Sequence, residues 1–431
     1  MQNQLSSLLI LVCSNCLAFQ GDERKLFNSS LEELLDMEIV SDKEGDSGFS
    51  IYGFVSPVSF EQVFNIPHLD EFGETETESD PLEYGDMSGF FYGSVRYKNI
   101  EGKIELFASN HEARLEAASI KYFFGSANQY SLAAGKFFRK FDLYNETLNH
   151  FIVFSGIEAP ELFDGDHTIP RFANLSFHWE KGPWQAYFDM GQPESGAEKD
   201  VIPVGWDFRY EQGKWLIGSS GYFSSLTQKG TSSSVAPGEG SPEGGVLPWM
   251  SEDRYAVVGA FIQRESRGFL IESAFWSAKH SGVRDPESVL LTERNTFLNE
   301  RQLFNFFGQN AGKPSGEYTA EDVLQDADYT VNTGYLRLGY AKSEFVYYAH
   351  WDWMDHPETI SDKKWGGDNE AGFSDDGTFT KWSVGIIWRP NSNIAIKLDG
   401  SVHTQDFNQA STSYPEVRAQ GSWAFKAGPW N

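Results

Sequence analysis

The chain has 431 residues, a formal net charge of -28 and 15% aromatic residues. This acid surplus would repel nucleic acid, so nucleic acid is excluded as a partner. No apolar stretch of about eighteen or more residues follows the N-terminus, which excludes helices that span a membrane.

Residues 1–18 read as a secretory signal peptide, because a short apolar core at 8–12 precedes small residues. No Lys or Arg precedes Arg24, so either the start lies upstream or the signal is weak. Both cysteines, Cys13 and Cys16, fall within this segment. The secreted chain would therefore have no disulfide, and the bulky neighbours of both cysteines argue against a lipoprotein anchor.

The next segment, 19–47, is predicted to lie in the periplasm. Ser30-Leu31-Glu32-Glu33 has the pattern of a capping box, and it would open a short amphipathic helix ending at Met37 or Ile39. We interpret this segment as a tether. The alternative is a small plug or a contact for a partner in the cell envelope.

From 48 to 431, apolar and polar residues alternate in runs of about ten, the length that crosses a membrane as a tilted strand. Near the C-terminus, Ile396 and Leu398 alternate with Lys397 and Asp399. The runs lie near 48–60, 88–98, 101–109, 113–124, 131–139, 172–180, 183–191, 202–211, 214–225, 255–265, 268–279, 333–342, 344–355, 379–389, 394–404 and 414–425. The number of strands predicted is therefore about sixteen, an even number as in single-chain barrels.

The sequence predicts that short connections alternate strictly with long ones along the chain. The longest segments are 61–87, 140–171, 226–254, 280–332 and 356–378. A soluble sandwich has no reason to segregate its loops in this way. The sequence therefore predicts an all-β fold, a transmembrane antiparallel β-barrel with short periplasmic turns and long external loops.

At this point the chain resembles the bacterial outer-membrane porins, whose third external loop folds into the pore. Here that loop runs from about 140 to 170. A short passage, Ala134-Gly135-Lys136-Phe137-Phe138 with Phe141 to Glu146, is also similar to the phosphate-selective porin group. Two features depart from that group: Lys+Arg 34 stand against Asp+Glu 62, and the chain ends on Pro429-Trp430-Asn431 instead of a terminal aromatic residue.

The resemblance implies a channel for passive diffusion of small polar solutes or ions. The sequence has no Gly-x-Ser-x-Gly elbow and no zinc-ligand spacing, so neither enzyme activity nor a cofactor or metal is predicted. The resemblance also implies the bacterial outer membrane as location, contact with its lipid and lipopolysaccharide, and a homotrimer. The alternative is a secreted all-β protein that binds carbohydrate or acts in adhesion. An active receptor with about 22 strands and a plug would need a longer chain.

The predicted constriction sets an acidic loop against a basic wall. The loop acids are Asp142, Glu146, Glu158, Glu161, Asp164 and Asp166. The wall residues are Arg96, Lys103, Arg114 and Lys136, taken to face the lumen because Val95, Ile104 and Leu115 would face lipid. Opposed charges would create a transverse field that orients polar solutes. The alternative places the carboxylates outside, solvated or bound to divalent ions.

Other charged groups bear on selectivity or on metal binding. The first and seventh external loops are acidic through Glu71, Glu74, Glu76, Glu78, Asp80, Glu83, Asp362, Asp368, Glu370, Asp375 and Asp376. We therefore expect cations or neutral polar solutes to be preferred over anions. His350, Asp352, Asp355 and His356 resemble a metal site, but in a strand they would be split between lumen and rim, which favours pore lining.

Overall fold

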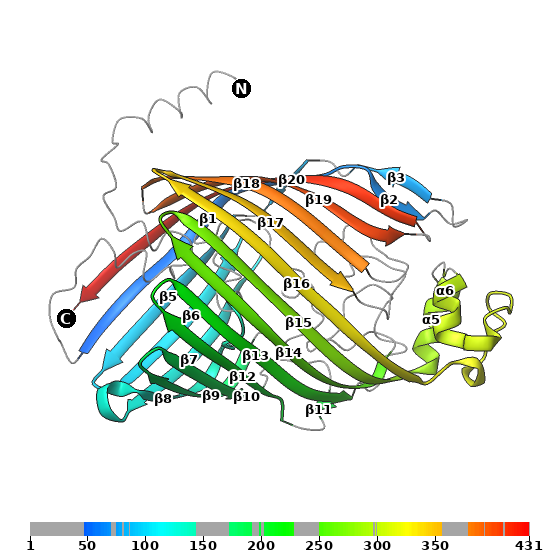
Figure 1. The fold of residues 1–431 in the computed structure, drawn as a ribbon, viewed down its shortest axis with the longest axis horizontal. Coiled ribbons are helices and arrows are strands. Elements are labelled where there is room, and N and C mark those ends of the chain that lie inside the picture. The colour runs from blue at the N-terminus through cyan, green and yellow to red at the C-terminus, as the bar shows by residue number, and fades with distance from the viewer. Residues whose placement is uncertain are drawn as a thin grey trace, which may run out of the picture.

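The computed structural model describes residues 47–69, 75–79, 82–85, 87–143, 172–191, 198–199, 202–227, 250–295, 298, 300–355, 378–391, 393–407 and 410–430. The predicted signal peptide and the periplasmic segment with its helix lie outside the described residues. The described chain forms a closed antiparallel barrel of 16 long strands, as the alternation predicts (Figure 1).

The long strands follow one another around the barrel in sequence order. They are β1 (Ser47–Val63), β5 (Ser88–Tyr97), β6 (Ile100–Ser109), β7 (Ala113–Phe124), β8 (Tyr130–Phe138), β9 (Phe172–Lys181), β10 (Trp184–Met190), β12 (Val204–Gln212), β13 (Trp215–Thr227), β14 (Met250–Ser266), β15 (Phe269–Arg284), β16 (Asp326–Lys342), β17 (Phe345–Asp355), β18 (Thr378–Asn391), β19 (Ile394–Phe407) and β20 (Ala410–Trp430). Short strands β2 (Ile66–Leu69), β3 (Thr75–Glu78), β4 (Glu83–Gly85) and β11 (Glu198–Lys199) lie in the connections.

The barrel closes where β1 pairs with β20. Arg418 of β20 lies opposite Glu61 of β1, and their side chains are 3.2 Å apart. Ser56 and Ser422 share a buried hydrogen bond of 2.9 Å across the same seam. These contacts link the first and last strands, so no long sheet edge is left exposed.

Inner and outer faces alternate along each strand, as predicted. On β19, Ile396, Leu398 and Val402 are 45–50% exposed on the outside. Lys397 and His403 point inward and are buried. An apolar outer face with paired backbone groups is what a membrane requires of a spanning sheet. The barrel wall is therefore built to contact lipid.

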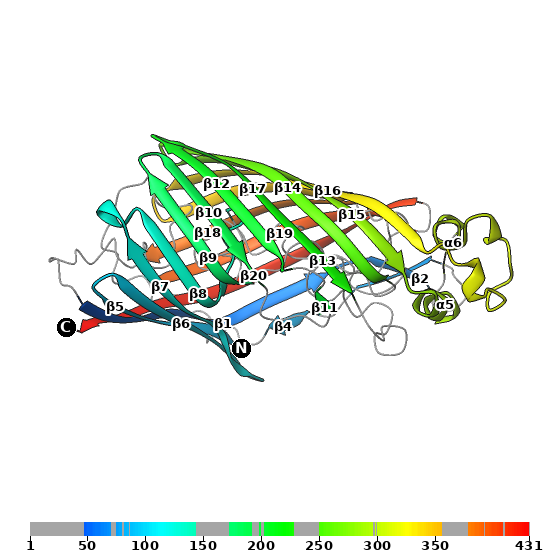
Figure 2. The same cartoon turned by 90° about the horizontal axis from the view of Figure 1, so that it is seen from below.

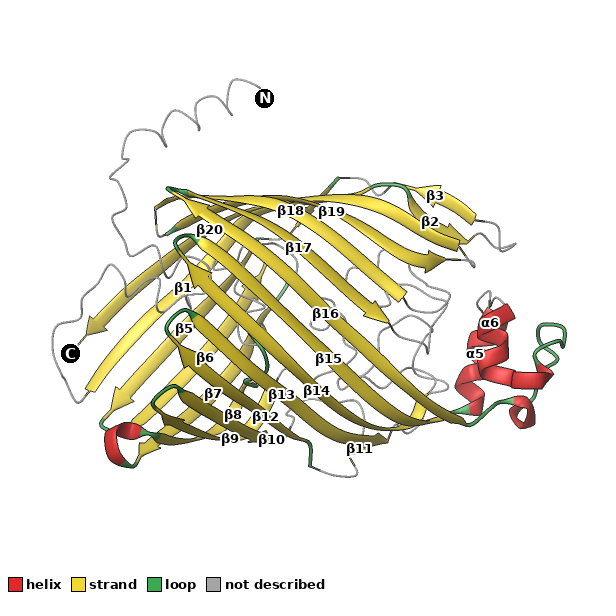
Figure 3. Cartoon of the chain, viewed as in Figure 1, coloured by secondary structure: helices red, strands yellow, loops and turns green. Residues whose placement is uncertain are grey.

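Short turns gather at one end of the barrel and the longer connections at the other (Figure 3). Two connections at the longer end are nevertheless short, at 110–112 and 408–409. The turn between β7 and β8 contains the 3-10 helix η2 (Ser126–Asn128). The segregation of loops is therefore strong but not complete.

The connection from β15 to β16 is a folded unit that the sequence prediction missed. It contains α5 (Pro286–Asn295), α6 (Glu300–Phe307), η3 (Gly308–Asn310) and η4 (Ala320–Asp322), and it projects from the long-loop end (Figure 2). Phe307 stacks on Tyr318 with ring centroids 3.9 Å apart. Arg284, at the end of β15, donates to the carbonyls of Leu324 and Asp326. No helix in the described part of the chain is long and apolar enough to cross a membrane.

Asp322 gives this projecting unit a dependence on pH. Hydrogen bonds from Lys313 Nζ at 2.6 Å and from Thr319 lower the pKa of the Asp322 carboxyl from 3.8 to about 2. A lowered pKa stabilises the fold above the ordinary value, and this contribution is lost as pH falls toward 2. We expect the η4 turn to become protease-sensitive between pH 4 and pH 2. In Lys313→Ala the onset should move to higher pH, whereas an Asp322 that titrates near 4 in the unaltered chain would contradict the prediction.

Candidate pore constriction

A bulge in β8 redirects the strand just before the third long connection. Gly135 has φ +136°, and a Cβ there would overlap the backbone of Ala118. The pairing of β8 with β9 shifts between Ala134 and Phe137 at the same place. Bulges bend a strand and change the direction of the chain that follows. The passage that resembles the phosphate-selective group is therefore a local bend.

Arg139 anchors the root of the third loop. Its buried guanidinium forms an ion pair with Asp189 of β10 and donates to the carbonyls of Phe172 and Gly191, each at 3.1 Å. The guanidinium also lies over the ring of Tyr222, 4.4 Å from its centre. Several strands thus meet at one buried cation. This ion pair could not be predicted from the sequence, because Asp189 lies 50 residues from Arg139 along the chain.

The loop stem after Arg139 packs against the inner faces of strands beyond β10. Phe141 is fully buried, and its ring centroid is 6.2 Å from that of Trp276 on β15. The backbone N–H of Asp142 donates to Asp207 Oδ2 of β12 at 3.1 Å and to Ser220 Oγ of β13 at 3.0 Å. The stem therefore turns toward the barrel interior.

Two further residues contact Asp142, one at its backbone carbonyl and one at its side chain. Arg209 donates to the Asp142 carbonyl at 2.5 Å, and Tyr335 Oη lies 3.4 Å from Asp142 Oδ2. Burial, reinforced by the nearby Glu272 carboxylate, raises the pKa of the Asp142 carboxyl well above its ordinary value. This acid consequently adds less negative charge to the lumen than the sequence suggests.

The remaining five predicted loop acids lie outside the described residues. They are Glu146, Glu158, Glu161, Asp164 and Asp166. Of the predicted constriction loop, only its stem with Asp142 can be placed against the barrel. The acidic loop opposite a basic wall therefore stays a prediction.

The predicted basic wall carries its own carboxylates. Arg114 is half exposed and forms ion pairs with Glu112 and, at 2.7 Å, with Glu116. Lys103 lies 3.5 Å from Glu101. Exposed ion pairs of this kind contribute little stability, but their charges partly cancel at a distance. The wall is therefore less positive than its cations alone suggest.

The other two predicted wall cations rest on aromatic rings. The Arg96 guanidinium lies 5.2 Å from the centre of the Phe123 ring. The Lys136 ammonium lies 4.3 Å from the centre of the Phe172 ring, which begins β9. Both rings can attract a cation through their negative faces. These two cations lie on β5 and β8, which are separated in the sheet by β6 and β7.

A second set of inner charges, which sequence reasoning missed, lies on β15 to β20. Register places opposite charges directly across neighbouring strands. The pairs are Glu272 with Arg337, Asp352 with Lys381, and Asp399 with Arg418. All six side chains are buried, unlike Lys103 and Arg114. The signal was present in the sequence, as inward positions of consecutive strands, but finding it needed the register.

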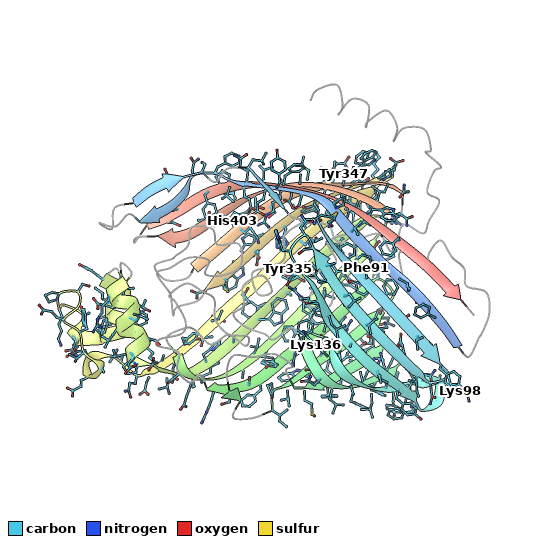
Figure 4. All side chains as sticks on the ribbon, turned by 180° about the vertical axis from the view of Figure 1, so that it is seen from behind. Phe91, Lys98, Lys136, Tyr335, Tyr347 and His403 are labelled. Atoms are coloured by element: carbon cyan, nitrogen blue, oxygen red, sulfur yellow. The ribbon has the colours of Figure 1, made fainter. Side chains whose placement is uncertain are left out.

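The inward-facing histidine side chains of the strands stack on tyrosine rings. Each faces a tyrosine on a neighbouring strand, and two members, His403 and Tyr335, point into the barrel in Figure 4. The pairs are His178 with Tyr187 (4.2 Å between centroids), His280 with Tyr329 (4.3 Å), His403 with Tyr414 (4.9 Å) and His350 with Tyr335 (5.7 Å). His350 and Asp352 share the inner face, 3.9 Å apart. Among the described residues no group of three or more potential metal ligands is present.

No protein-family model and no curated protein sequence matches the chain. Solved structures share its fold. The anion-selective porin from Comamonas acidovorans has a TM-score of 0.53 and 10% identity over 88% of this chain and 100% of its own. OmpT of Vibrio cholerae, an outer-membrane protein, has a TM-score of 0.51 and 7% sequence identity over 89% of this chain and 99% of its own. The outer-membrane channel DcaP of Acinetobacter baumannii has a TM-score of 0.50 and 12% sequence identity over 89% of this chain and 99% of its own. The chain therefore has the fold of the outer-membrane porins, with an apolar outer face suited to contact with a lipid bilayer.

Proposed function

We propose that this chain is a channel for passive diffusion of small polar solutes or ions, narrowed by its third external loop. The observation that carries the proposal is the stem of that loop. From Arg139 to Asp142 it leaves the wall at β8 and contacts the inner faces of β10, β12, β13 and β15. A loop that begins in this direction and continues for about thirty residues has enough length to narrow the lumen.

The distribution of exposed charge supports a route for solutes along β5 to β7. Arg96, Lys103 and Arg114 are exposed on the inner face of these strands, whereas the inner charges of β15 to β20 are covered. Arg114 lies near the long-loop end, Lys103 near mid-wall and Arg96 near the short turns. A polar solute could exchange its water for these groups in successive steps.

We expect the open channel to favour cations or neutral polar solutes over anions. The external loops carry the acid surplus, and at the wall the cations Arg114 and Lys103 are offset by Glu112, Glu116 and Glu101. The measurement is the reversal potential of single channels in a salt gradient. The preference should fade as salt rises, because mouth charges act within roughly 8 Å at physiological salt.

An anion preference would contradict this expectation. If neutralising Lys136 and Arg114 abolished such a preference, the basic wall would be the selectivity filter, and the similarity to the phosphate-selective group would gain weight. Lys98→Gln, in the turn between β5 and β6, is the matched control because it removes an exposed cation without touching the inner wall. Absence of any channel would contradict the proposed function itself.

Further parts of the proposal concern partners. We propose a homotrimer, contact with outer-membrane lipid and lipopolysaccharide, and a tether role for the N-terminal segment. The alternative of a secreted carbohydrate-binding protein fits poorly, because Val95, Ile104 and Ile120 would expose apolar side chains to water. Detergent dependence and a heat-dependent shift in gel migration would distinguish a membrane barrel from a soluble lectin.

A further inference from the structure

Three neighbouring strands place a carboxylate between two cations on the inner wall. Arg96 of β5 lies opposite Glu101 of β6, and Glu101 lies opposite Lys121 of β7. The three strands lie side by side in the barrel (Figure 2). Side chains that lie directly opposite on one face of a sheet have Cβ atoms about 5 Å apart. The row is close to the short-turn end, so a solute that leaves the lumen along these strands passes it.

A phenylalanine ring shares the inner face with this row. Phe123 follows Lys121 by two residues, so both side chains point to the same side of β7. The Arg96 guanidinium lies 5.2 Å from the centre of the Phe123 ring, and the Lys121 ammonium lies 5.0 Å from it. Positive, negative and apolar groups are therefore within reach of one small molecule.

These side chains are accessible from the lumen. Arg96 is exposed, and Lys121 and Phe123 are half-buried. Glu101 is 19% exposed and lies 3.5 Å from Lys103. Within the described part of the chain, the Arg96 side chain has its contact with the ring and no ion pair. A hydrogen bond between ionised groups is stronger than an exposed cation–π contact, so an entering carboxylate would draw Arg96 away and uncover the ring.

The arrangement of charges selects among small solutes. An anion would be attracted by the cations but repelled by Glu101, and a cation would be repelled by Arg96 and Lys121. A zwitterion satisfies both signs, because its carboxylate can accept from the cations while its ammonium donates to Glu101. A ring on the same molecule would pack on Phe123, and aromatic pairs attract one another beyond the burial of apolar area.

We propose that Arg96, Glu101, Lys121 and Phe123 form a binding site for aromatic amino acids in their zwitterionic form. The inference rests on the proposed function, since the site lies along the route for solutes in the lumen. A ligand without net charge agrees with the expected preference for cations or neutral polar solutes. The site is open to water, so binding is weak and the solute can leave, as conduction requires.

The test compares four small solutes on the purified, folded full chain in planar bilayers. Binding is measured from the fluctuations that each solute adds to the single-channel current. L-phenylalanine carries all three groups, whereas alanine lacks the ring, phenylpropionate lacks the ammonium and phenethylamine lacks the carboxylate. L-phenylalanine should bind roughly fivefold more tightly than each of the other three, the factor expected for losing one ring contact or one partly exposed charge pair.

Three variants assign the contacts to individual side chains. Phe123→Leu should lower the affinity for L-phenylalanine to that for alanine. The matched control is Tyr122→Leu, which should leave the affinity unchanged because Tyr122 is 45% exposed on the outside of the same strand. Glu101→Gln should weaken L-phenylalanine and strengthen phenylpropionate, whereas Arg96→Gln should weaken L-phenylalanine and strengthen phenethylamine. A purely structural role would not shift solutes of opposite charge in opposite directions. Heat-dependent gel migration verifies that each variant is folded.

The outcomes separate this inference from the channel function. Equal affinity of the unaltered chain for all four solutes would overturn the site, as would equal effects of Phe123→Leu and Tyr122→Leu. Tighter binding of phenylpropionate than of L-phenylalanine would also overturn it, by making an aromatic anion the ligand. Conductance in salt alone is recorded first. Its absence would overturn both the channel and the site, whereas a conducting chain that binds all four solutes equally would overturn the site alone.

Discussion

Asp189→Ala is expected to destabilise the barrel by about 3–5 kcal/mol, because it leaves the buried guanidinium of Arg139 without its carboxylate partner. Both side chains are almost fully buried, so water cannot replace the lost group. The measurement is the free energy of unfolding in urea, with the barrel in lipid vesicles. Single-channel recordings should also show larger fluctuations in current, since the root of the third loop would be released.

Two further variants define the origin of this effect. Glu101→Gln breaks an exposed pair with Lys103 and should cost less than about 1 kcal/mol. Gly205→Ala should also lower the free energy of unfolding, because a Cβ at Gly205 would overlap the Arg139 guanidinium and the Asp189 carboxylate. If Asp189→Ala cost no more than Glu101→Gln, Arg139 would not be the anchor of the loop.

Alternation of side chains predicted the barrel because it depends only on neighbouring residues. On β19, the alternation predicts Ile396 and Leu398 on one face and Lys397 and Asp399 on the other, and the structure exposes the first two outside and buries the last two inside. Strand ends were predicted less well. β16 begins at Asp326 instead of near 333, because polar outward residues above the apolar band hide the alternation that defines a membrane strand.

The unit between β15 and β16 contains helices that the sequence could have predicted in part. Its helix signals are local: Asp285 accepts from the backbone N–H of Ser288 at 3.0 Å, and Pro286 begins α5. Both signals can be read from the sequence. The packing of Phe307 on Tyr318 cannot, because it depends on how the helices fold back on one another.

In the candidate site, too, some features could be predicted from the sequence and others could not. Sequence parity predicts Lys103 and Arg114 on the inner wall, and the same alternation places their carboxylate partners Glu101 and Glu112 two residues away on that face. The bulge between Glu105 and Leu106 shifts the pairing of β6 with β7, so partners there do not follow from simple alternation. Asp142 was correctly placed in the third loop, yet its burial depends on Tyr335, nearly two hundred residues away.

The second large effect is expected at the centre of the outer face. Ile104 lies in the middle of β6, a strand of 10 residues, and its side chain is 49% exposed on the outside. A strand of this length just crosses the hydrocarbon, so its middle lies near the bilayer midplane. Ile104→Arg should therefore cost about 2–4 kcal/mol of folding free energy in lipid vesicles.

The neighbouring residue supplies the control. Lys103→Gln alters charge one position away on the inner face, where the side chain is 44% exposed, and it should change stability by less than about 1 kcal/mol. Lys397 would be a poor control, because its inward side chain is fully buried and its loss would disturb packing as well as charge. The large penalty at Ile104 should disappear for Ile104→Leu, which keeps an apolar surface toward lipid. If Ile104→Arg and Lys103→Gln lowered the folding free energy equally, both faces of β6 would be packed alike. That result would contradict a strand that lies between lipid and a water-filled lumen.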